Sequence, residues 1–132
     1  MNEFINYIVQ STVKDVLITG YVDSEIPSSF HPMYDRIYFV ISDDIFELYI
    51  DDGLINCNKL NVIDKWFEVD EDDKFSLMSV YSQLFKTEQE LKVTLVDYQF
   101  TPFSAITIWY KDGSNERQIC LDPNNFFGFT FL

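Results

Sequence analysis

Hydrophobic and polar residues alternate most regularly between Arg36 and Leu60, and this pattern predicts three antiparallel strands. A two-residue turn at Asp43-Asp44 would place the apolar residues of the first two strands on one face, in the pairs Ile37–Ile50, Phe39–Leu48 and Ile41–Phe46. A second turn at Asp52-Gly53, a favoured hairpin dipeptide, would continue that face through the pairs Ile50–Ile55 and Leu48–Cys57. The first turn is the less favourable of the two because it lacks glycine. A slip of one residue would turn the apolar face toward water, so the pattern specifies which residues face the core.

Helical spacing of apolar residues predicts two helices. The first spans residues 3–14, with Asn2 as a candidate N-cap and Glu3 in the first turn, and its apolar positions are Phe4, Ile5, Ile8, Val9 and Val13. The second spans residues 74–86, where the apolar positions are Phe75, Met78, Tyr81, Leu84 and Phe85.

The remaining segments predict strands and connections. Val16–Val22 is β-rich, with Gly20 as a candidate bulge, and residues 24–32 form a loop that contains Pro27 and Pro32. Residues 61–69 form either another strand or an irregular crossing, anchored by Ile63, Trp66, Phe67 and Val69. Further strands are expected near residues 91–99, 103–111, 115–122 and 126–131, with a hairpin turn at Asp112-Gly113 and connections at Pro102 and Pro123.

This element order predicts the α+β class: a mostly antiparallel sheet of about eight or nine strands, an N-terminal helix and one central helix. The 132 residues are expected to form a single domain, 1–132, without internal repeats or linkers. Two blocks of four strands on either side of a helix are similar in order to the Whirly domain. This similarity rests on element order alone.

Composition indicates a folded chain, because 47% of the residues are hydrophobic and 17% are aromatic. No apolar run approaches the roughly 18 residues that a membrane helix needs, and the N-terminus lacks the basic region of a signal peptide. Cys57 and Cys120 both lie in strand-like segments. We interpret them as reduced residues of a cytoplasmic protein, with one disulfide between them as the alternative.

The net charge of −13 is the most unusual property of the chain. Such a charge repels nucleic acids and anionic membranes and attracts basic partners, although acidity also serves solubility. Residues 43–73 contain eleven acids and two lysines, a net charge of −9, against −4 in the other 101 residues. If the negative charge served only solubility, it would not need to be concentrated in one part of the chain. We therefore predict a surface that binds a basic protein partner through Asp43, Asp44, Glu47, Asp51, Asp52, Glu68, Asp70, Glu71, Asp72 and Asp73.

The run "DEDD" at residues 70–73 does not predict a metal site. The calcium loop that could begin at Asp70 lacks the glycine of the sharp turn and the distal glutamate. Asp72 or Asp73 could cap a helix that begins at Lys74, which would leave the other acids unexplained. We predict neither a metal nor a cofactor.

Catalytic signatures are scarce in the sequence. His31 is the only histidine, and a base of this kind could serve Ser28 or Ser29 nearby in the predicted loop. The chain contains no G-x-S-x-G, no C-x-x-C and no glycine-rich phosphate loop. The C-terminal segment "FFGFTFL" is expected to form a buried last strand, with an exposed edge for self-association as the alternative. These observations favour a protein that is not an enzyme.

The acidic segments "SDDIFELYIDDG" and "FEVDEDDKF", set in an aromatic-rich α+β chain, resemble the immunity proteins of bacterial polymorphic toxin systems, including contact-dependent growth inhibition. The resemblance concerns general character and has no defining motif. It implies a cytoplasmic inhibitor that binds the C-terminal domain of a toxin, often a basic nuclease. Two alternatives remain: a nucleic-acid mimic that occupies a DNA- or RNA-binding protein, and a small-molecule enzyme or carrier with a pocket between sheet and helix.

Overall fold

The computed structural model describes residues 1–99, 105–125 and 128–131. These residues form, in chain order, α1 (Asn2–Gln10), β1 (Val13–Val22), β2 (Phe30–Ile41), β3 (Asp44–Asp51), β4 (Leu54–Leu60), β5 (Lys74–Ser79), α2 (Tyr81–Phe85), β6 (Lys92–Gln99), β7 (Ala105–Asp112), β8 (Asn115–Asn125) and β9 (Gly128–Phe131). The predicted α+β class with a mostly antiparallel sheet is confirmed.

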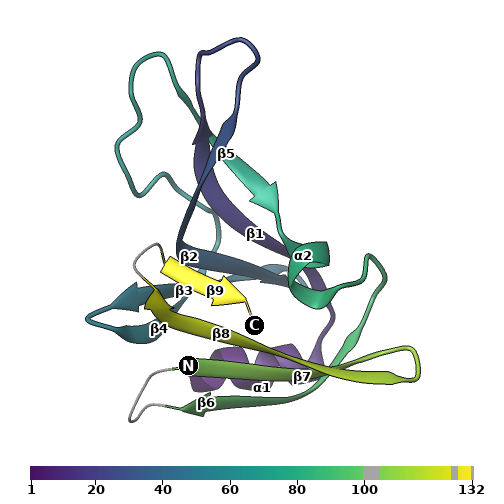
Figure 1. Cartoon of the computed structure of the whole chain (residues 1–132). Coiled ribbons are helices and arrows are strands. Elements are labelled where there is room, and N and C mark those ends of the chain that lie inside the picture. The colour runs from purple at the N-terminus through teal and green to yellow at the C-terminus, as the bar shows by residue number, and fades with distance from the viewer. Residues whose placement is uncertain (100–104, 126–127, 132) are drawn as a thin grey trace.

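The nine strands of the described chain join into one curled sheet that has two blocks (Figure 1). In the first block, β1 pairs with β5 on one edge and with β2 on the other, and β3 and β4 follow as hairpins. In the second block, β6, β7, β8 and β9 follow one another in antiparallel order. The two blocks meet where β9 runs parallel to β2, at the pair Tyr34–Gly128.

The strand β2 bends sharply where the blocks meet. Here the single residue Ile18 of β1 lies opposite residues 34–37 of β2, and an insertion of this kind bends and twists the longer strand. Gly128 makes the junction close: a Cβ at this position would lie 2.4 Å from the carbonyl carbon of Tyr34. Its φ of +106° is also one that side chains disfavour.

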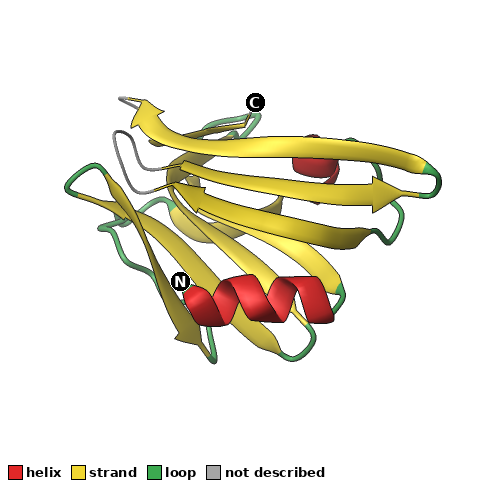
Figure 2. Ribbon diagram, turned by 90° about the horizontal axis from the view of Figure 1, so that it is seen from below, coloured by secondary structure: helices red, strands yellow, loops and turns green. Residues whose placement is uncertain are grey.

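The apolar core lies between α1 and the sheet and includes residues of both blocks. Phe4 and Ile8 of α1 are fully buried, and the ring centroid of Phe4 lies 5.3 Å from that of Phe39 and 5.7 Å from that of Phe46. Figure 2 shows α1 lying lengthwise against the curled sheet. The Tyr98 hydroxyl of β6 donates a hydrogen bond of 3.0 Å to the Ile55 carbonyl of β4, so the two ends of the sheet also touch.

The first predicted helix is shorter than its pattern indicated. It ends at Gln10, and Met1 instead of Asn2 occupies the N-cap position. Ser11 is extended, and Val13 begins β1, where it is buried opposite Ile41. Val13 therefore reaches the core from a strand, so its apolar character fitted either structure.

The strand faces between Arg36 and Leu60 are confirmed, but the first register is wrong by two residues. The turn is at Ser42-Asp43, and the pairs are Ile41–Asp44, Phe39–Phe46 and Ile37–Leu48. Since side chains alternate with a period of two, this shift leaves the same apolar residues on the core side. The second hairpin is as predicted, with positive φ at both turn residues, Asp52 and Gly53, as a type I′ turn requires.

The predicted helix over residues 74–86 is wrong for most of its length. Lys74–Ser79 forms β5, and only Tyr81–Phe85 is helical. Phe75 and Leu77 alternate with polar Ser76, so the segment also fits a strand, and pairing with β1 satisfies its backbone groups. No helix begins at Lys74, so the proposed capping by Asp72 or Asp73 is wrong too. Residues 61–69 follow the irregular alternative.

Smaller predictions are corrected by the register. Gly20 pairs regularly with Pro32, and the irregularities of β1 lie elsewhere. The hairpin between β7 and β8 turns at Gly113-Ser114, because Asp112 pairs with Asn115, and Pro123 lies within β8.

The described part of the C-terminal segment, β9, joins the interior of the sheet. Phe129 is buried in β9, which lies between β2 and β8 and not at an exposed edge. The predictions for Pro102, Phe126 and Phe127 fall outside the described residues.

Replacing Gly128 with alanine should strongly destabilise the protein, because the new Cβ would clash with the backbone of Tyr34. We expect a loss of about 3 kcal/mol in the free energy of unfolding, measured by urea denaturation. Gly113→Ala is the matched control, since Gly113 also has positive φ but no atom near its would-be Cβ. The free energy of unfolding of the control should fall by only about 1 kcal/mol, which is the cost of a non-glycine residue in the left-handed backbone conformation. Equal losses in the two variants would contradict a tight junction.

Candidate functional site

A polar and aromatic cluster lies on the face of the first block that points away from α1. The guanidinium of Arg36 lies over the ring of Trp66, 4.5 Å from its centroid, and 5.6 Å from the centroid of Tyr49. The indole of Trp66 donates a hydrogen bond of 2.8 Å to the hydroxyl of Thr19, which is fully buried. These contacts hold the irregular segment before β5 against the sheet.

Glu47 belongs to this cluster and is not a surface acid. Its side chain is only 6% exposed, and one carboxylate oxygen lies 3.1 Å from an Arg36 nitrogen. The other oxygen accepts a hydrogen bond of 3.4 Å from Asn58. Burial, followed by the neighbouring Glu47 carboxylate, raises the pKa of Tyr38. The prediction that Glu47 contacts a partner is therefore wrong, because its carboxylate neutralises Arg36 inside the fold.

The other predicted acids fall into separate groups. Asp43 and Asp44 lie at the turn before β3, where Lys14 is 3.6 Å from Asp43 and Lys59 is 3.9 Å from Asp44. Asp51 and Asp52 lie at the opposite end of β3. The register therefore separates these two pairs by the length of the strand, and only the first pair has lysines beside it in the described chain.

Carboxylates do gather at the end of the molecule formed by the β1–β2 hairpin and the loop before β5, which is uppermost in Figure 1. Residues 70–73 form a turn in which the Asp73 amide donates to the Asp70 carbonyl at 3.0 Å. This turn borders a hollow of about 250 Å³, lined by Tyr21, Met33, Glu68, Val69, Asp70 and Asp73. We call it the acidic hollow.

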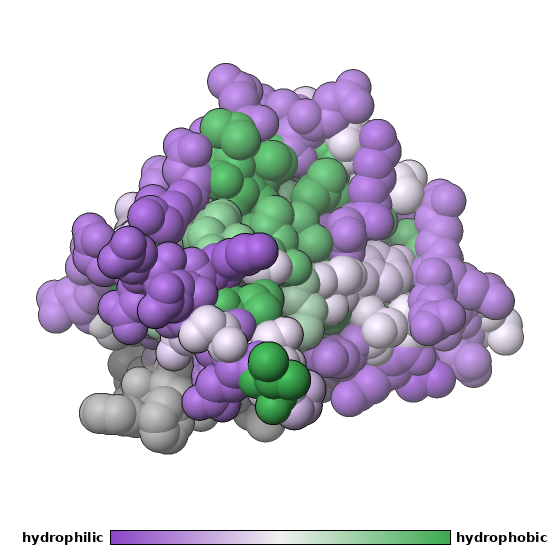
Figure 3. All heavy atoms as spheres, turned by 90° about the horizontal axis from the view of Figure 1, so that it is seen from above, coloured by the Kyte–Doolittle hydropathy of each residue, from purple (hydrophilic) through white to green (hydrophobic). Residues whose placement is uncertain are grey.

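The acidic hollow is lined mostly by polar atoms, with a smaller apolar part. Met33, Tyr21 and Val69 supply an apolar wall, and three carboxylates supply an anionic rim. Figure 3 looks down on this end and shows apolar atoms gathered at its centre with hydrophilic atoms around them. Such a site suits a lysine or arginine side chain, whose aliphatic stem covers apolar surface while the charged head meets carboxylates.

The hollow does not have the geometry of a metal site. Among the described residues, no three histidine, cysteine, aspartate or glutamate side chains lie close enough to share a metal ion.

His31 lies beside the hollow and not in a loop, since β2 begins at Phe30. Its ring stacks on Tyr21 with centroids 4.7 Å apart, and its Nε2 lies 2.8 Å from an Asp23 oxygen. The hydrogen bond with His31 lowers the pKa of Asp23. The hydrogen-bond partner of His31 is thus the Asp23 carboxylate and not Ser28 or Ser29, so the geometry does not assemble the base and nucleophile considered above.

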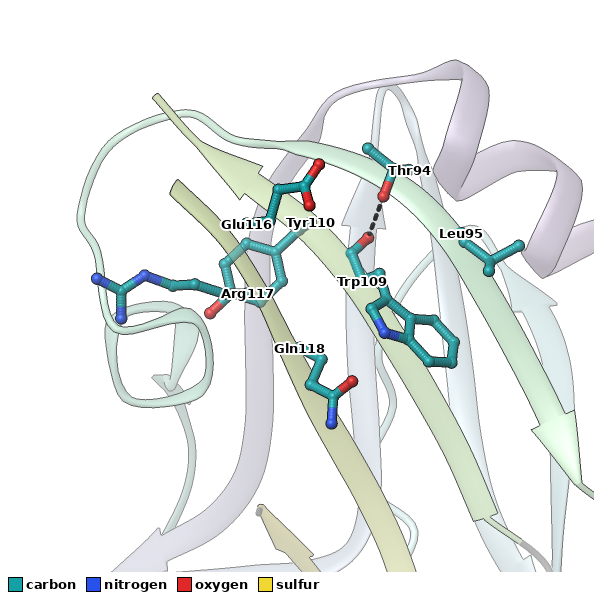
Figure 4. A pocket seen from close by; sticks show the side chains of 7 residues that line it. All are labelled: Thr94, Leu95, Trp109, Tyr110, Glu116, Arg117 and Gln118. Atoms are coloured by element: carbon teal, nitrogen blue, oxygen red, sulfur yellow. Dashed lines mark hydrogen bonds between the residues drawn. The ribbon is translucent and has the colours of Figure 1, made fainter. Parts of the chain in front are cut away.

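A wider hollow, about 490 Å³, lies at β6, β7 and β8 (Figure 4). Its polar and aromatic side chains do not converge: Figure 4 shows Arg117 and Trp109 pointing in opposite directions from their strands. The Thr94 hydroxyl is already used in a hydrogen bond of 3.2 Å to the Trp109 carbonyl. This arrangement offers little support for the alternative of a small-molecule enzyme.

Both cysteines are free thiols, so the alternative of a disulfide is not realised. Cys57 lies opposite Leu48, as predicted, but it is partly and not fully buried. Burial raises the pKa of its thiol to about 11.

Comparison with family models, with curated proteins and with solved structures finds no match to this chain. No helix within the described ranges has the length and apolar character needed to cross a membrane.

The sequence predicted the acids of the hollow but not its walls. Tyr21 and Met33 precede the acids by 35 to 52 positions, and no spacing rule links them. The alternation of side chains in β1 places Thr19 and Tyr21 on the same face of the strand. This was the only feature of the sequence that indicated that Tyr21 could line the hollow.

Replacing Glu47 with glutamine should lower stability, because Arg36 would keep its charge without a compensating carboxylate. We expect a loss of about 2 kcal/mol in the free energy of unfolding, below the usual cost for a buried pair because Arg36 is partly exposed. Asp51→Asn is the control, and it should change stability by no more than about 0.5 kcal/mol. Urea denaturation of both variants tests this contrast, and equal effects would refute the structural role of Glu47.

Cys57 should react slowly with thiol reagents in the folded protein, because the thiolate is the nucleophile and its pKa is about 11. In a Cys120→Ser variant at pH 8, about one thousandth of Cys57 would be ionised, against about a quarter for an unperturbed thiol. The labelling rate should rise about tenfold per pH unit between pH 7 and 10. Labelling at pH 8 that is as fast in the folded protein as in urea would contradict this environment.

Proposed function

We propose that the protein is a non-enzymatic binding protein that inhibits a cationic protein domain, as an immunity protein inhibits a toxin. The acidic hollow carries the proposal, because it offers three carboxylates around an apolar wall at one end of the molecule. A lysine or arginine of the partner would fill the hollow, and the surrounding acids would contact further basic residues.

The carboxylates around the hollow lack cations of their own. Within the described chain, no ion pair joins a lysine, arginine or histidine to Glu68, Asp70, Glu71, Asp72 or Asp73. Neighbouring like charges repel one another, and a cationic partner would relieve this repulsion on binding. Opposite charges also speed association and disfavour wrong partners, which suits a protein that must capture a toxin quickly.

A protein partner fits these features better than nucleic acid, since a net charge of −13 repels phosphates. Mimicry of nucleic acid would use a row of unpaired carboxylates. Asp43 and Asp44, at one end of β3, lie beside Lys14 and Lys59, and Glu47 in its middle is buried. The acids of β3 therefore form no such row, and the hollow supports recognition of individual basic side chains.

Removing the charges of the hollow should abolish inhibition without unfolding the protein. The test variant combines Glu68→Gln, Asp70→Asn and Asp73→Asn. Each protein is co-expressed with the C-terminal region encoded by the upstream gene, and growth rescue and complex formation are measured. We expect the variant to bind at least about 100-fold more weakly, mainly through slower association and loss of salt dependence.

The matched control removes three charges elsewhere through Glu88→Gln, Glu90→Gln and Asp97→Asn, and it should rescue growth like the original protein. Both triple variants should keep their free energy of unfolding within about 1 kcal/mol. If the hollow variant still rescues growth and binds normally at low salt, the hollow is not the interface. If the original protein neither rescues growth nor binds, the proposed inhibition of this partner is wrong.

A further inference from the structure

A second groove lies on another side of the molecule, between α2 and β8. It is a hollow of about 290 Å³ lined by Gln83, Leu84 and Lys86 from α2 and its C-cap, and by Tyr110, Arg117, Gln118 and Ile119 from β7 and β8. The acidic hollow shares none of these residues. The groove therefore needs an explanation of its own.

One side of the groove is a strand edge with unpaired backbone. β7 occupies one edge of β8, and on the other edge β9 pairs with β8 only from Leu121 to Asn125 in the described chain. Within the described residues, 115–119 have no strand partner on that edge, and their outward amide and carbonyl groups form a template for an added strand. A peptide strand here would continue the line of β9 along β8.

The floor of the groove is apolar and closed. Leu84, Tyr110 and Ile119 are each less than 5% exposed, and the Tyr110 hydroxyl is engaged by donating 2.7 Å to the Phe85 carbonyl. The volume is at the lower end of the range for ligand pockets, about 300–1,000 Å³. This space suits one apolar side chain better than a large ligand.

The rim of the groove is cationic in an otherwise acidic protein. Lys86 and Arg117 line it, no carboxylate does, and neither cation forms an ion pair within the described residues. Gln83 and Gln118 add amide groups that can donate hydrogen bonds. The rim is thus complementary to a negatively charged end group.

We propose that this groove binds the C-terminal end of an extended peptide whose last residue is apolar. The peptide backbone pairs with the free edge of β8, its last side chain enters the space above Leu84 and Ile119, and its terminal carboxylate meets Lys86 and Arg117. A strand edge, an apolar socket and two cations together match these three parts of a peptide terminus. The site is independent of the acidic hollow and of the function proposed for it.

The probe is the peptide acetyl-Ser-Thr-Val-Thr-Leu with a free carboxylate, titrated into isotope-labelled protein and followed by amide NMR shifts. An ionic strength of about 0.15 M limits repulsion by the distant acids, because the Debye length is then about 8 Å. We expect the shifts to concentrate in residues 115–120 and 83–86. The same peptide with a C-terminal amide should bind at least about tenfold more weakly.

The variant Lys86→Gln/Arg117→Gln should lose about tenfold in affinity for the carboxylate peptide and little for the amide. Lys65→Gln/Lys74→Gln is the matched control, which removes two exposed cations elsewhere and should bind like the original protein. No binding at about 1 mM peptide, equal binding of carboxylate and amide, equal loss in the control, or shifts centred elsewhere would each overturn the proposal. Hexanoate binding as tightly as the peptide would also overturn it, because the strand edge would then contribute nothing.

Discussion

The bend in β2 is the constraint on which the rest of the fold depends. β2 pairs with β1 along one edge and divides its other edge between β3 and β9, so every strand of the described chain connects through it. Without the bend, β9 could not reach β2 past β3, and the second block would lose its junction with the first. Gly128 permits this junction because no other residue could lie so close to Tyr34.

The bend also creates the need for the Arg36 cluster. Residues 34–37 have no partner in β1, and Arg36 lies within this stretch, where it pairs with Tyr49 of β3. Its charge is neutralised by Glu47, and its flat face is covered by Trp66, whose indole in turn satisfies the buried Thr19 hydroxyl. Buried polar groups are tolerated only when they have such partners. The segment that carries Trp66 then continues into the acidic turn before β5, so the cluster positions the acidic hollow.

Two surfaces of opposite character result from this architecture. The acidic hollow lies at the β1–β2 hairpin, where carboxylates meet an apolar wall, and the groove at β8 combines two cations with an apolar floor. Each surface lies beside an end of a strand: β5 begins after the acidic turn, and in the described chain β9 pairs with only part of β8. In our proposals, one surface binds a basic side chain and the other binds a peptide carboxylate.

The sequence by itself determined the fold class, most of the strands and the residues that face the core, because these depend on the alternation of nearby side chains. It also determined that acids concentrate in residues 43–73. Only the tertiary structure decided that Glu47 is buried, that Lys74–Ser79 is a strand and that Asp43 and Asp51 lie far apart, because each outcome depends on residues distant in the chain. Phe75 and Met78 fit a helix as well as a strand. Pairing with the edge of β1 determined that the segment forms a strand. Arg36 explains the burial of Glu47, since the guanidinium in the bend pairs with its carboxylate at 3.1 Å.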